Sequence, residues 1–461
     1  MGNLSAGTPA NGLKLTKATG AARFLITGAC IAALAACGGN DSSSTANDGA
    51  NANPGTEDSD HGGDGEFHID TMGRLAIHES GAASVRVLEL DNKEMIATIA
   101  TANPVSALHA SPDRRYAVAV QRNQDLVEFI DGGIWQEDHG DHLHDYREDP
   151  VAMSYRLEGV RPTHYESHDE LAAIFNDGLA DTNTNATVTV ISDVGIATDR
   201  TEATLDLPMQ MHGTAEPRGR YLLTTWRAPD NRDTLPEQVE LYVYEESGYQ
   251  LVTRFEETCP RLHGSFANES HTAFGCEDGV LVVSQSGDTF TASKLANPAG
   301  LPEDVRIGSV YGHHDSVSFI GFARPGYLFE IDPVANEIHP ITWPGQQVVT
   351  TAFANEGKSF LVMDEAGTVH MLDATAGWSV SASVPAASGI PEEGSQPSIE
   401  PHGHEPAAYV SDPLGKRIVV LDLASGSASD TIAVEFAPGQ VRWLGIAEDE
   451  HDHDGEHDHD E

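Results

Sequence analysis

Between residues 67 and 447 the apolar positions form short runs, rich in Val, Ile, Leu, Phe and Tyr, and the runs come in pairs separated by turn residues. Runs of this kind, bounded by Gly, Pro, Asn and Asp, are typical of β-strands joined by tight turns. Eight pairs are predicted: 74–78 with 85–90, 116–121 with 126–130, 172–176 with 187–192, 221–226 with 240–244, 272–275 with 280–284, 317–322 with 327–331, 359–363 with 368–372, and 407–410 with 417–421. No long amphipathic helix pattern interrupts them, so we predict an all-β fold.

A period of about fifty residues relates these pairs, because a histidine precedes most of them. The histidines are His109, His164, His212, His263, His313 or His314, and His402 or His404. A repeat of this length with four short strands is typical of a β-propeller blade. We therefore predict a propeller of eight blades, with seven as the alternative, closed by a last strand at 441–446 that joins the first blade.

The first strand of each propeller blade lines the central channel. If the repeated histidine lies at that position, imidazoles from different blades approach one axis and form a ring. The alternative is structural, because a histidine at the start of a blade can tie a loop to its neighbour through hydrogen bonds.

The longest polar insert, 131–150, holds a cluster of eight residues, Asp138-His139-Gly140-Asp141-His142-Leu143-His144-Asp145. Imidazole and carboxylate are ligands that Zn²⁺ prefers. His142 and His144 are two positions apart, so on an extended backbone both point the same way. We expect the insert to fold over one mouth of the channel and to combine its histidines with the ring. The alternative is a solvated acidic loop.

The first residues are typical of an export signal: Lys14, Lys17 and Arg23 precede an apolar run at 24–36. The run ends in Leu34-Ala35-Ala36-Cys37-Gly38, which resembles a bacterial lipoprotein signal, in which the cysteine is lipidated. An ordinary cleaved signal is the alternative. Both place the mature protein outside the cytoplasm.

These patterns divide the chain into four parts. We predict a lipoprotein-type signal at 1–36, a disordered tether at 37–66, the propeller at 67–447, and a tail at 448–461 made almost entirely of His, Asp and Glu. The tail is interpreted as a flexible metal trap, and a merely solvated charge run is the alternative.

Cysteine content and charge limit the compartments and the classes of partner that are consistent with this chain. Cys259 and Cys276 lie seventeen positions apart in an exported chain, which favours a disulfide. The chain has 26 Lys and Arg against 72 Asp and Glu, a formal charge of −46. Such acidity argues against nucleic acid and anionic lipid as partners and suits a protein that attracts cations, although salt adaptation would also produce it.

Taken together, these features resemble the AztD family of periplasmic zinc metallochaperones, accessory proteins of zinc-specific ABC importers. The most specific part is the segment 133–148, in which Gly133-Ile134-Trp135-Gln136-Glu137 precedes the histidine cluster and Tyr146-Arg147-Glu148 follows it. The histidines that begin the blades, the cysteine pair and the ending Trp443-Leu444-Gly445-Ile446 fit as well.

The resemblance implies a β-propeller without catalytic activity that binds Zn(II) and passes it to the solute-binding protein of the importer. It implies a periplasmic location, to which the lipoprotein signal adds a membrane anchor at Cys37. The metal ligands would come from the insert and from the channel: His139, Asp141, His142, His144, His109, His164, His212, His263, His402 and His404.

Two other functions are consistent with the same residues. The first is a propeller enzyme or copper protein that uses channel histidines, and the second is a protein-binding propeller whose histidines are structural.

For a zinc site made of histidines we expect zinc affinity to fall steeply below about pH 6, because imidazole binds metal only when it is neutral.

Overall fold

The computed structural model describes residues 68–139, 143–230, 234–302 and 305–447. By its internal contacts the chain divides into two units, Met1–Gly62 and Gly63–Glu461, and every described residue belongs to the second. The predicted signal, lipidated Cys37, the whole of the tether and the tail lie outside the described residues, as do Asp141 and His142 of the insert.

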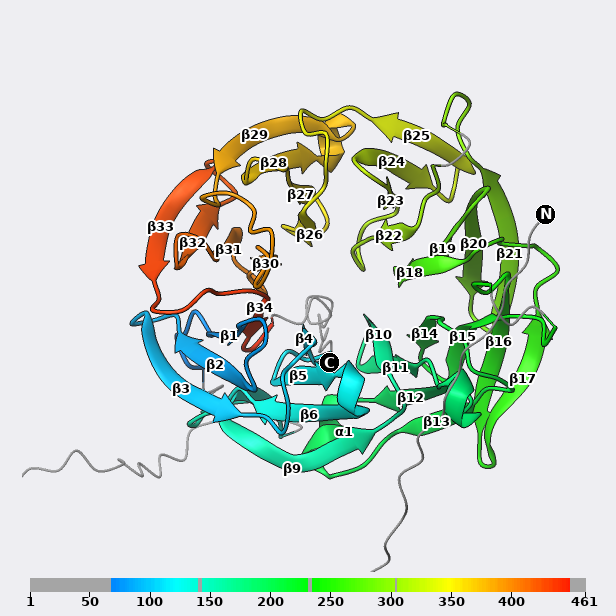
Figure 1. Cartoon of the computed structure of the whole chain (residues 1–461), viewed down its shortest axis with the longest axis horizontal. Coiled ribbons are helices and arrows are strands. Elements are labelled where there is room, and N and C mark those ends of the chain that lie inside the picture. Colours follow the sequence, from blue (N-terminus) through cyan, green and yellow to red (C-terminus); the bar gives the residue numbers. More distant parts are fainter. Residues whose placement is uncertain (1–67, 140–142, 231–233, 303–304, 448–461) are drawn as a thin grey trace, which may run out of the picture. The chain divides into compact units, whose positions relative to one another are not determined.

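Eight four-stranded antiparallel sheets surround a central channel, which confirms the predicted eight-bladed propeller and excludes seven blades (Figure 1). From the channel outward, blade 1 consists of β34 (Val441–Leu444), β1 (Arg74–His78), β2 (Ser84–Glu89) and β3 (Glu94–Ala100), and blade 2 of β4 (Ala107–Ala110), β5 (Tyr116–Gln121), β6 (Leu126–Asp131) and β9 (Val151–Glu158). Blade 3 consists of β10 (Pro162–His168), β11 (Leu171–Asn176), β12 (Thr187–Ile191) and β13 (Ala203–Asp206), and blade 4 of β14 (Ala215–Arg218), β15 (Tyr221–Trp226), β16 (Gln238–Glu245) and β17 (Gly248–Arg254).

Blades 5 to 8 follow in the same order. Blade 5 consists of β18 (His263–Ala267), β19 (His271–Cys276), β20 (Gly279–Ser286) and β21 (Thr289–Ala296), and blade 6 of β22 (Ser309–Tyr311), β23 (Phe319–Ala323), β24 (Tyr327–Asp332) and β25 (Glu337–Ile341). Blade 7 consists of β26 (Thr350–Ala354), β27 (Ser359–Met363), β28 (Thr368–Asp373) and β29 (Ser379–Pro385), and blade 8 of β30 (Ile399–Pro401), β31 (Ala407–Asp412), β32 (Arg417–Asp422) and β33 (Ser427–Ala433).

Few elements lie outside the blades. A hairpin of β7 (Ile134–Asp138) and β8 (Leu143–Arg147) forms a sheet of its own in the predicted insert. One short helix, α1 (Asp193–Ala197), and the 3₁₀ turns Arg122–Gln124, Ala180–Thr182 and Ala374–Ala376 complete the described residues. Among these residues no helix has the length and apolar character needed to cross a membrane.

The two middle strands of each blade carry the apolar runs because both of their faces pack against neighbouring blades. β5 is buried at every position, whereas the outer strand β3 is exposed or half-buried throughout. A separate hydrophobic core fills each of the eight interfaces between successive blades. Between blades 3 and 4 this core contains Phe175, Val188, Met211 and Leu222.

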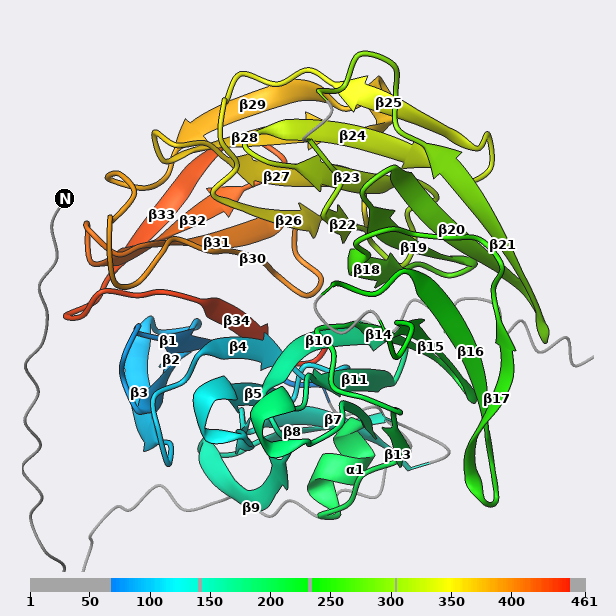
Figure 2. The ribbon, with the colours of Figure 1, turned by 45° about the vertical axis from the view of Figure 1, so that its right-hand side comes forward.

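The ring is closed by β34, which pairs with β1 as the innermost strand of blade 1, as predicted (Figure 2). Trp443 is completely buried in this strand, and its Nε1 donates to the carbonyl oxygen of Met72 at 2.9 Å. A Cβ added to Gly73 would lie 2.7 Å from Nε1 of Trp443, so the indole fills a space that only glycine leaves. In blades 4 and 5, the predicted Cys259–Cys276 disulfide is present.

Replacing Trp443 with alanine is expected to lower the free energy of unfolding by about 3–5 kcal/mol, because it removes a fully buried side chain from the strand that closes the ring. Urea unfolding followed by circular dichroism measures this change. Val334→Ala, at a side chain that is 68% exposed, is the control and should stay within about 0.5 kcal/mol of the parent. Equal losses in the two variants would show that closure does not depend on the indole.

Candidate metal centre

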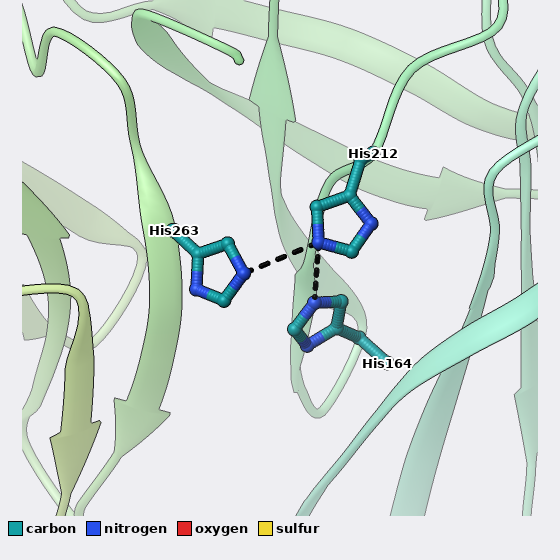
Figure 3. A group of neighbouring side chains, drawn as sticks. All are labelled: His164, His212 and His263. Atoms are coloured by element: carbon teal, nitrogen blue, oxygen red, sulfur yellow. Dashed lines mark hydrogen bonds between the residues drawn. The ribbon is translucent and has the colours of Figure 1, made fainter.

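Three of the predicted channel histidines come together, from three successive blades (Figure 3). His164 lies in β10, His212 precedes β14, and His263 begins β18. The Nε2 atom of His212 lies 3.3 Å from Nε2 of His164 and 3.2 Å from Nε2 of His263. Two nitrogens bound to a tetrahedral zinc at about 2.0–2.1 Å are about 3.3 Å apart, so the spacing is that of a zinc site.

The local backbone aims these side chains inward. The strand register shifts at His164 and again at His263, and such bulges turn a side chain away from the regular pleat. Gly264 continues the second bulge with a φ of +65°, a conformation that favours glycine. Beside His212, a Cβ added to Gly213 would lie 2.6 Å from the ring of Phe175 in blade 3, so the close approach of blades 3 and 4 requires glycine here.

Hydrogen bonds at Nδ1 set the tautomers of His212 and His263. Nδ1 of His263 donates to the carbonyl oxygen of Gly308 at 2.9 Å, and Nδ1 of His212 lies 3.2 Å from Oδ2 of Asp177. Nδ1 of His164 faces Oε1 of Glu166 at 3.7 Å. A proton on each Nδ1 leaves each Nε2 with a lone pair directed at the other two. The three Nε2 lone pairs repel one another, and a cation bound between them would replace this repulsion with attraction.

Burial also keeps the imidazoles in the form that binds metal. It lowers the pKa of His164 to about 4, and the neighbouring His212 adds to the effect. Burial lowers the pKa of His263 to about 4 as well, although the hydrogen bond with Gly308 opposes this. Both rings are therefore neutral near pH 7, with no proton to displace when a metal ion binds.

A second group lies at the other end of the same inner strand. It consists of His168, Asp169 and His314, whose ligand atoms lie within 4.8 Å of one another. Nε2 of His168 donates to the carbonyl oxygen of Asn268 at 3.0 Å, so its Nδ1 carries a lone pair and faces Oδ2 of Asp169 at 3.0 Å. Two acceptors at this distance need a proton or a metal ion between them.

A cavity of about 440 Å³ opens onto this second group. Its walls include Glu166, His168, Asp169 and His314, and also His109. The second group is therefore accessible from the channel, whereas the three-histidine group of His164, His212 and His263 does not line this cavity.

The other predicted channel histidines lie apart from both groups. His109 stacks on Tyr165 with ring centroids 4.6 Å apart, and burial lowers its pKa to about 3. Nε2 of His402 donates to the carbonyl oxygen of Met72, and its Nδ1 accepts from the backbone amides of His404 and Glu405, so both ring nitrogens are occupied. His404 lies against the ring of His402, at 4.6 Å between centroids.

The hairpin of the insert carries the remaining predicted ligands that the structure describes. The rings of His139 and His144 are 5.9 Å apart, and Nε2 of His139 lies 3.3 Å from the hydroxyl of Tyr146. Arg147 in β8 pairs with Glu89 of blade 1. The described part of the hairpin thus contacts blade 1, and it contributes no ligand to either group in the channel.

Sequence reasoning missed four residues of these groups. Asp177, Glu166, His168 and Asp169 were not predicted to take part. One pattern points to two of them: the alternation in His164-Tyr-Glu166-Ser-His168 places three polar side chains on one face of a strand. Asp177 gives no such signal, because it reaches His212 from a loop 35 positions earlier.

Comparisons with known proteins agree with this geometry. No family model matches the chain. Among characterised proteins it matches the zinc chaperone AztD of Citrobacter koseri, with 25% identity over 402 residues that cover 84% of this chain and 91% of that protein. The chain is similar to AztD. The resemblance predicted from the sequence is thereby confirmed, and the relative it identifies is a chaperone.

Solved structures confirm the fold. The crystal structure of Citrobacter koseri AztD superposes with a TM-score of 0.69 at 24% identity, covering 80% of this chain and 96% of that one. The structure of apo AztD gives the same TM-score at 22% identity, with 80% and 97% covered. The dihydro-heme d1 dehydrogenase NirN follows with a TM-score of 0.54, 13% identity and 83% and 77% covered, which shows a shared fold alone.

Asp177→Asn is expected to weaken zinc binding at the three-histidine group by about 10–100-fold, because the amide no longer fixes the tautomer of His212. Competition with a fluorescent zinc chelator, on protein that ends at residue 447, measures this change. Asp364→Asn is a matched control, since Asp364 holds His370 at 3.1 Å outside both groups. An unchanged affinity in Asp177→Asn would exclude this role for Asp177.

Proposed function

We propose that this protein is a zinc chaperone outside the cytoplasm, which holds Zn²⁺ as cargo and delivers it to the solute-binding protein of a zinc ABC importer. The observation that carries the proposal is the three-histidine group, in which Nε2 of His212 lies from Nε2 of each partner at the spacing of a tetrahedral zinc site. The similarity to AztD supports the same function.

Three imidazoles leave the fourth position of a tetrahedral ion open. Structural zinc sites close all four positions, whereas sites that exchange a ligand keep one free. An acceptor protein can therefore add its own ligand before the first histidine leaves, and transfer proceeds by replacement of one ligand at a time. His139, Asp141, His142 and His144 of the insert, and the tail 448–461, are proposed to capture the ion and exchange it rapidly.

The N-terminal sequence and the cysteine pair support the proposed compartment. We propose that 1–36 is a lipoprotein-type signal, that Cys37 carries the lipid, and that 37–66 is a flexible tether to the membrane. The Cys259–Cys276 disulfide supports an oxidising compartment such as the periplasm. We propose no catalytic activity, in keeping with the chaperone function of the characterised relative.

Replacing His212 with alanine is expected to abolish the binding of one zinc ion per chain. Nε2 of His212 lies within 3.3 Å of Nε2 of both His164 and His263, so the substitution removes the ligand that the other two share as a neighbour. Elemental analysis of protein that ends at residue 447, purified without added metal, measures the stoichiometry. His339→Ala is the control, at an exposed side chain in an outer strand. If the variant kept all of its zinc, the cargo site would have to lie in the insert or in the second group.

The same proteins test transfer. Zinc-loaded parent protein should load a purified solute-binding protein of a zinc importer faster than an equal concentration of zinc in a chelator buffer, because the acceptor replaces ligands directly. His212→Ala should transfer no more than the buffer does. Equal rates for the parent and the buffer would exclude chaperone activity and favour metal storage or a protein-binding function.

The pH dependence of zinc affinity should differ from that of three ordinary histidines. Each histidine that must lose a proton changes affinity about tenfold per pH unit below its pKa. Since the pKa values of His164 and His263 are about 4, these two contribute almost nothing between pH 6 and pH 5. We expect a slope of no more than about one decade per pH unit there, steepening toward pH 4.

Chelator competition at fixed ionic strength, again without the tail, measures this slope. A slope of about three decades per pH unit between pH 6 and pH 5 would show that the ligands titrate as exposed imidazoles, and would contradict the buried three-histidine group as the cargo site.

A further inference from the structure

The second group, formed by His168, Asp169 and His314, joins two blades that are not neighbours in the ring. His168 ends β10 of blade 3 and Asp169 follows it, whereas His314 lies between β22 and β23 of blade 6. Oδ2 of Asp169 lies 3.0 Å from Nδ1 of His168, and Oδ1 lies 3.5 Å from Nδ1 of His314. These distances bracket the spacing of about 3.3 Å between two ligands of a tetrahedral zinc ion. One carboxylate thus stands between two imidazoles.

A loop of blade 5 holds both sides of this group. The carbonyl oxygen of Asn268 accepts from Nε2 of His168 at 3.0 Å, and the buried amide side chain of Asn268 donates to the carbonyl oxygen of Ser316 at 2.8 Å. The backbone amide of Glu269 donates to the carbonyl oxygen of His314 at 3.1 Å. The ring from blade 3 and the loop from blade 6 are therefore fixed against the same two residues, so the protein itself holds the three side chains at their spacing.

The buried ring of His168 presents a lone pair without a hydrogen-bond donor. A carbonyl oxygen can only accept, so the bond to Asn268 places the proton of neutral His168 on Nε2. Nδ1 is buried and makes no hydrogen bond within the described part of the chain. Its lone pair faces the carboxylate of Asp169, which is also an acceptor. Such a contact is costly unless a cation or a second proton lies between the two atoms, and only a metal ion at that position also engages His314.

Another buried histidine, paired with an aspartate, shows how a structural arrangement differs. Nδ1 of His370 lies 2.8 Å from the hydroxyl of Ser383, and Nε2 lies 3.1 Å from Oδ2 of Asp364. Both ring nitrogens are therefore occupied, and among the described residues no third metal-ligating side chain joins the pair. His168 differs on both counts, because one of its nitrogens is left over and a second imidazole faces the same carboxylate.

The second group is separate from the three-histidine group and can be reached from the channel. Four residues of regularly paired strand separate His164 from His168, which is about 13 Å at about 3.3 Å per residue. The two groups share no residue, so both can hold an ion at the same time. The cavity of about 440 Å³ reaches the second group, where the side chain of Asp169 is 53% exposed.

We propose that His168, Asp169 and His314 form a second zinc site, which is occupied independently of the three-histidine group, so that one chain carries two ions. Two imidazoles and one carboxylate are a zinc ligand set that leaves a fourth position open for water or for a ligand of the acceptor protein. This inference deepens the proposed function, on which the choice of zinc rests. The cation site itself rests only on the geometry of the three side chains.

Asp169→Asn tests the site with little change in the backbone, because Asp169 has a φ of +51° and asparagine tolerates this conformation. The starting protein is the full chain carrying His212→Ala, which removes one ligand of the three-histidine group, and competition with a fluorescent zinc chelator is the measurement. Adding Asp169→Asn or His314→Ala should weaken the binding of one zinc ion per chain by about tenfold or more, since loss of even an outer-shell partner has this effect. The insert and the tail are identical in all of these proteins and contribute equally.

Asp199→Asn is the matched control, because Asp199 is exposed, has a φ of +55° and lies outside both groups. It should bind zinc as the starting protein does, and similar thermal midpoints for the two Asp→Asn variants guard against misfolding. Equal zinc affinities in Asp169→Asn, His314→Ala and Asp199→Asn would overturn the proposal, and His168 and Asp169 would then be an imidazolium–carboxylate pair. This comparison does not use the three-histidine group, so it holds even if that group binds no zinc, and failure of the proposed function is read separately.

The position of the ion has its own measurement. In crystals of the zinc-loaded full chain, anomalous scattering at the zinc edge should place an ion at about 2.0–2.1 Å from Nδ1 of His168. A map with a zinc peak at the three-histidine group and none beside His168 would contradict the second site.

Discussion

Closure of the ring determines the geometry of everything in the channel. Each hydrophobic core joins two neighbouring blades, so the distance between two inner strands depends on the packing of the interfaces around the ring, and β34 completes the last of them. The three histidines come from blades 3, 4 and 5 and are held through two hydrophobic cores. Because packed cores resist displacement, the Nε2 atoms keep their spacing without a metal ion to gather them.

The sequence predicts the middle strands of every blade and misses most inner and outer ones. Middle strands are buried on both faces and therefore have continuous apolar runs, as in β5. The outer strand β17 faces solvent and the inner strand β10 faces a polar channel, so their sequences, Gly-Tyr-Gln-Leu-Val-Thr-Arg and Pro-Thr-His-Tyr-Glu-Ser-His, lack such a run. The fold could be recognised because the spacing of the middle pairs and of the repeated histidines gives the period without an assignment of the inner and outer strands.

The candidate site was predictable only in part, because histidines that recur along the sequence have different neighbours in the structure. His212-Gly213 and His402-Gly403 share a dipeptide, and both precede the middle strands of their blades. His212 lies before its inner strand β14 and meets His164 and His263 of the two adjacent blades, whereas His402 directly follows its inner strand β30 and packs on Trp443 with ring centroids 4.7 Å apart. The dipeptide alone shows neither on which side of the inner strand it lies nor that the partner of His402 comes from the end of the chain.

Charge balance explains why carboxylates accompany the histidines. Three neutral imidazoles around a divalent ion leave a charge of about +2 inside the protein, which burial would make unfavourable without compensation. Asp177 faces the outer nitrogen of His212 and supplies part of that compensation, while Arg122 pairs with the same carboxylate at 2.8 Å. Glu166 faces the outer nitrogen of His164 at 3.7 Å, but burial raises the pKa of Glu166 to about 8, so near pH 7 it is mostly protonated and adds little negative charge. A centre whose counter-charge is shared in this way holds a divalent ion less firmly than one with two free carboxylates, which suits the delivery proposed above.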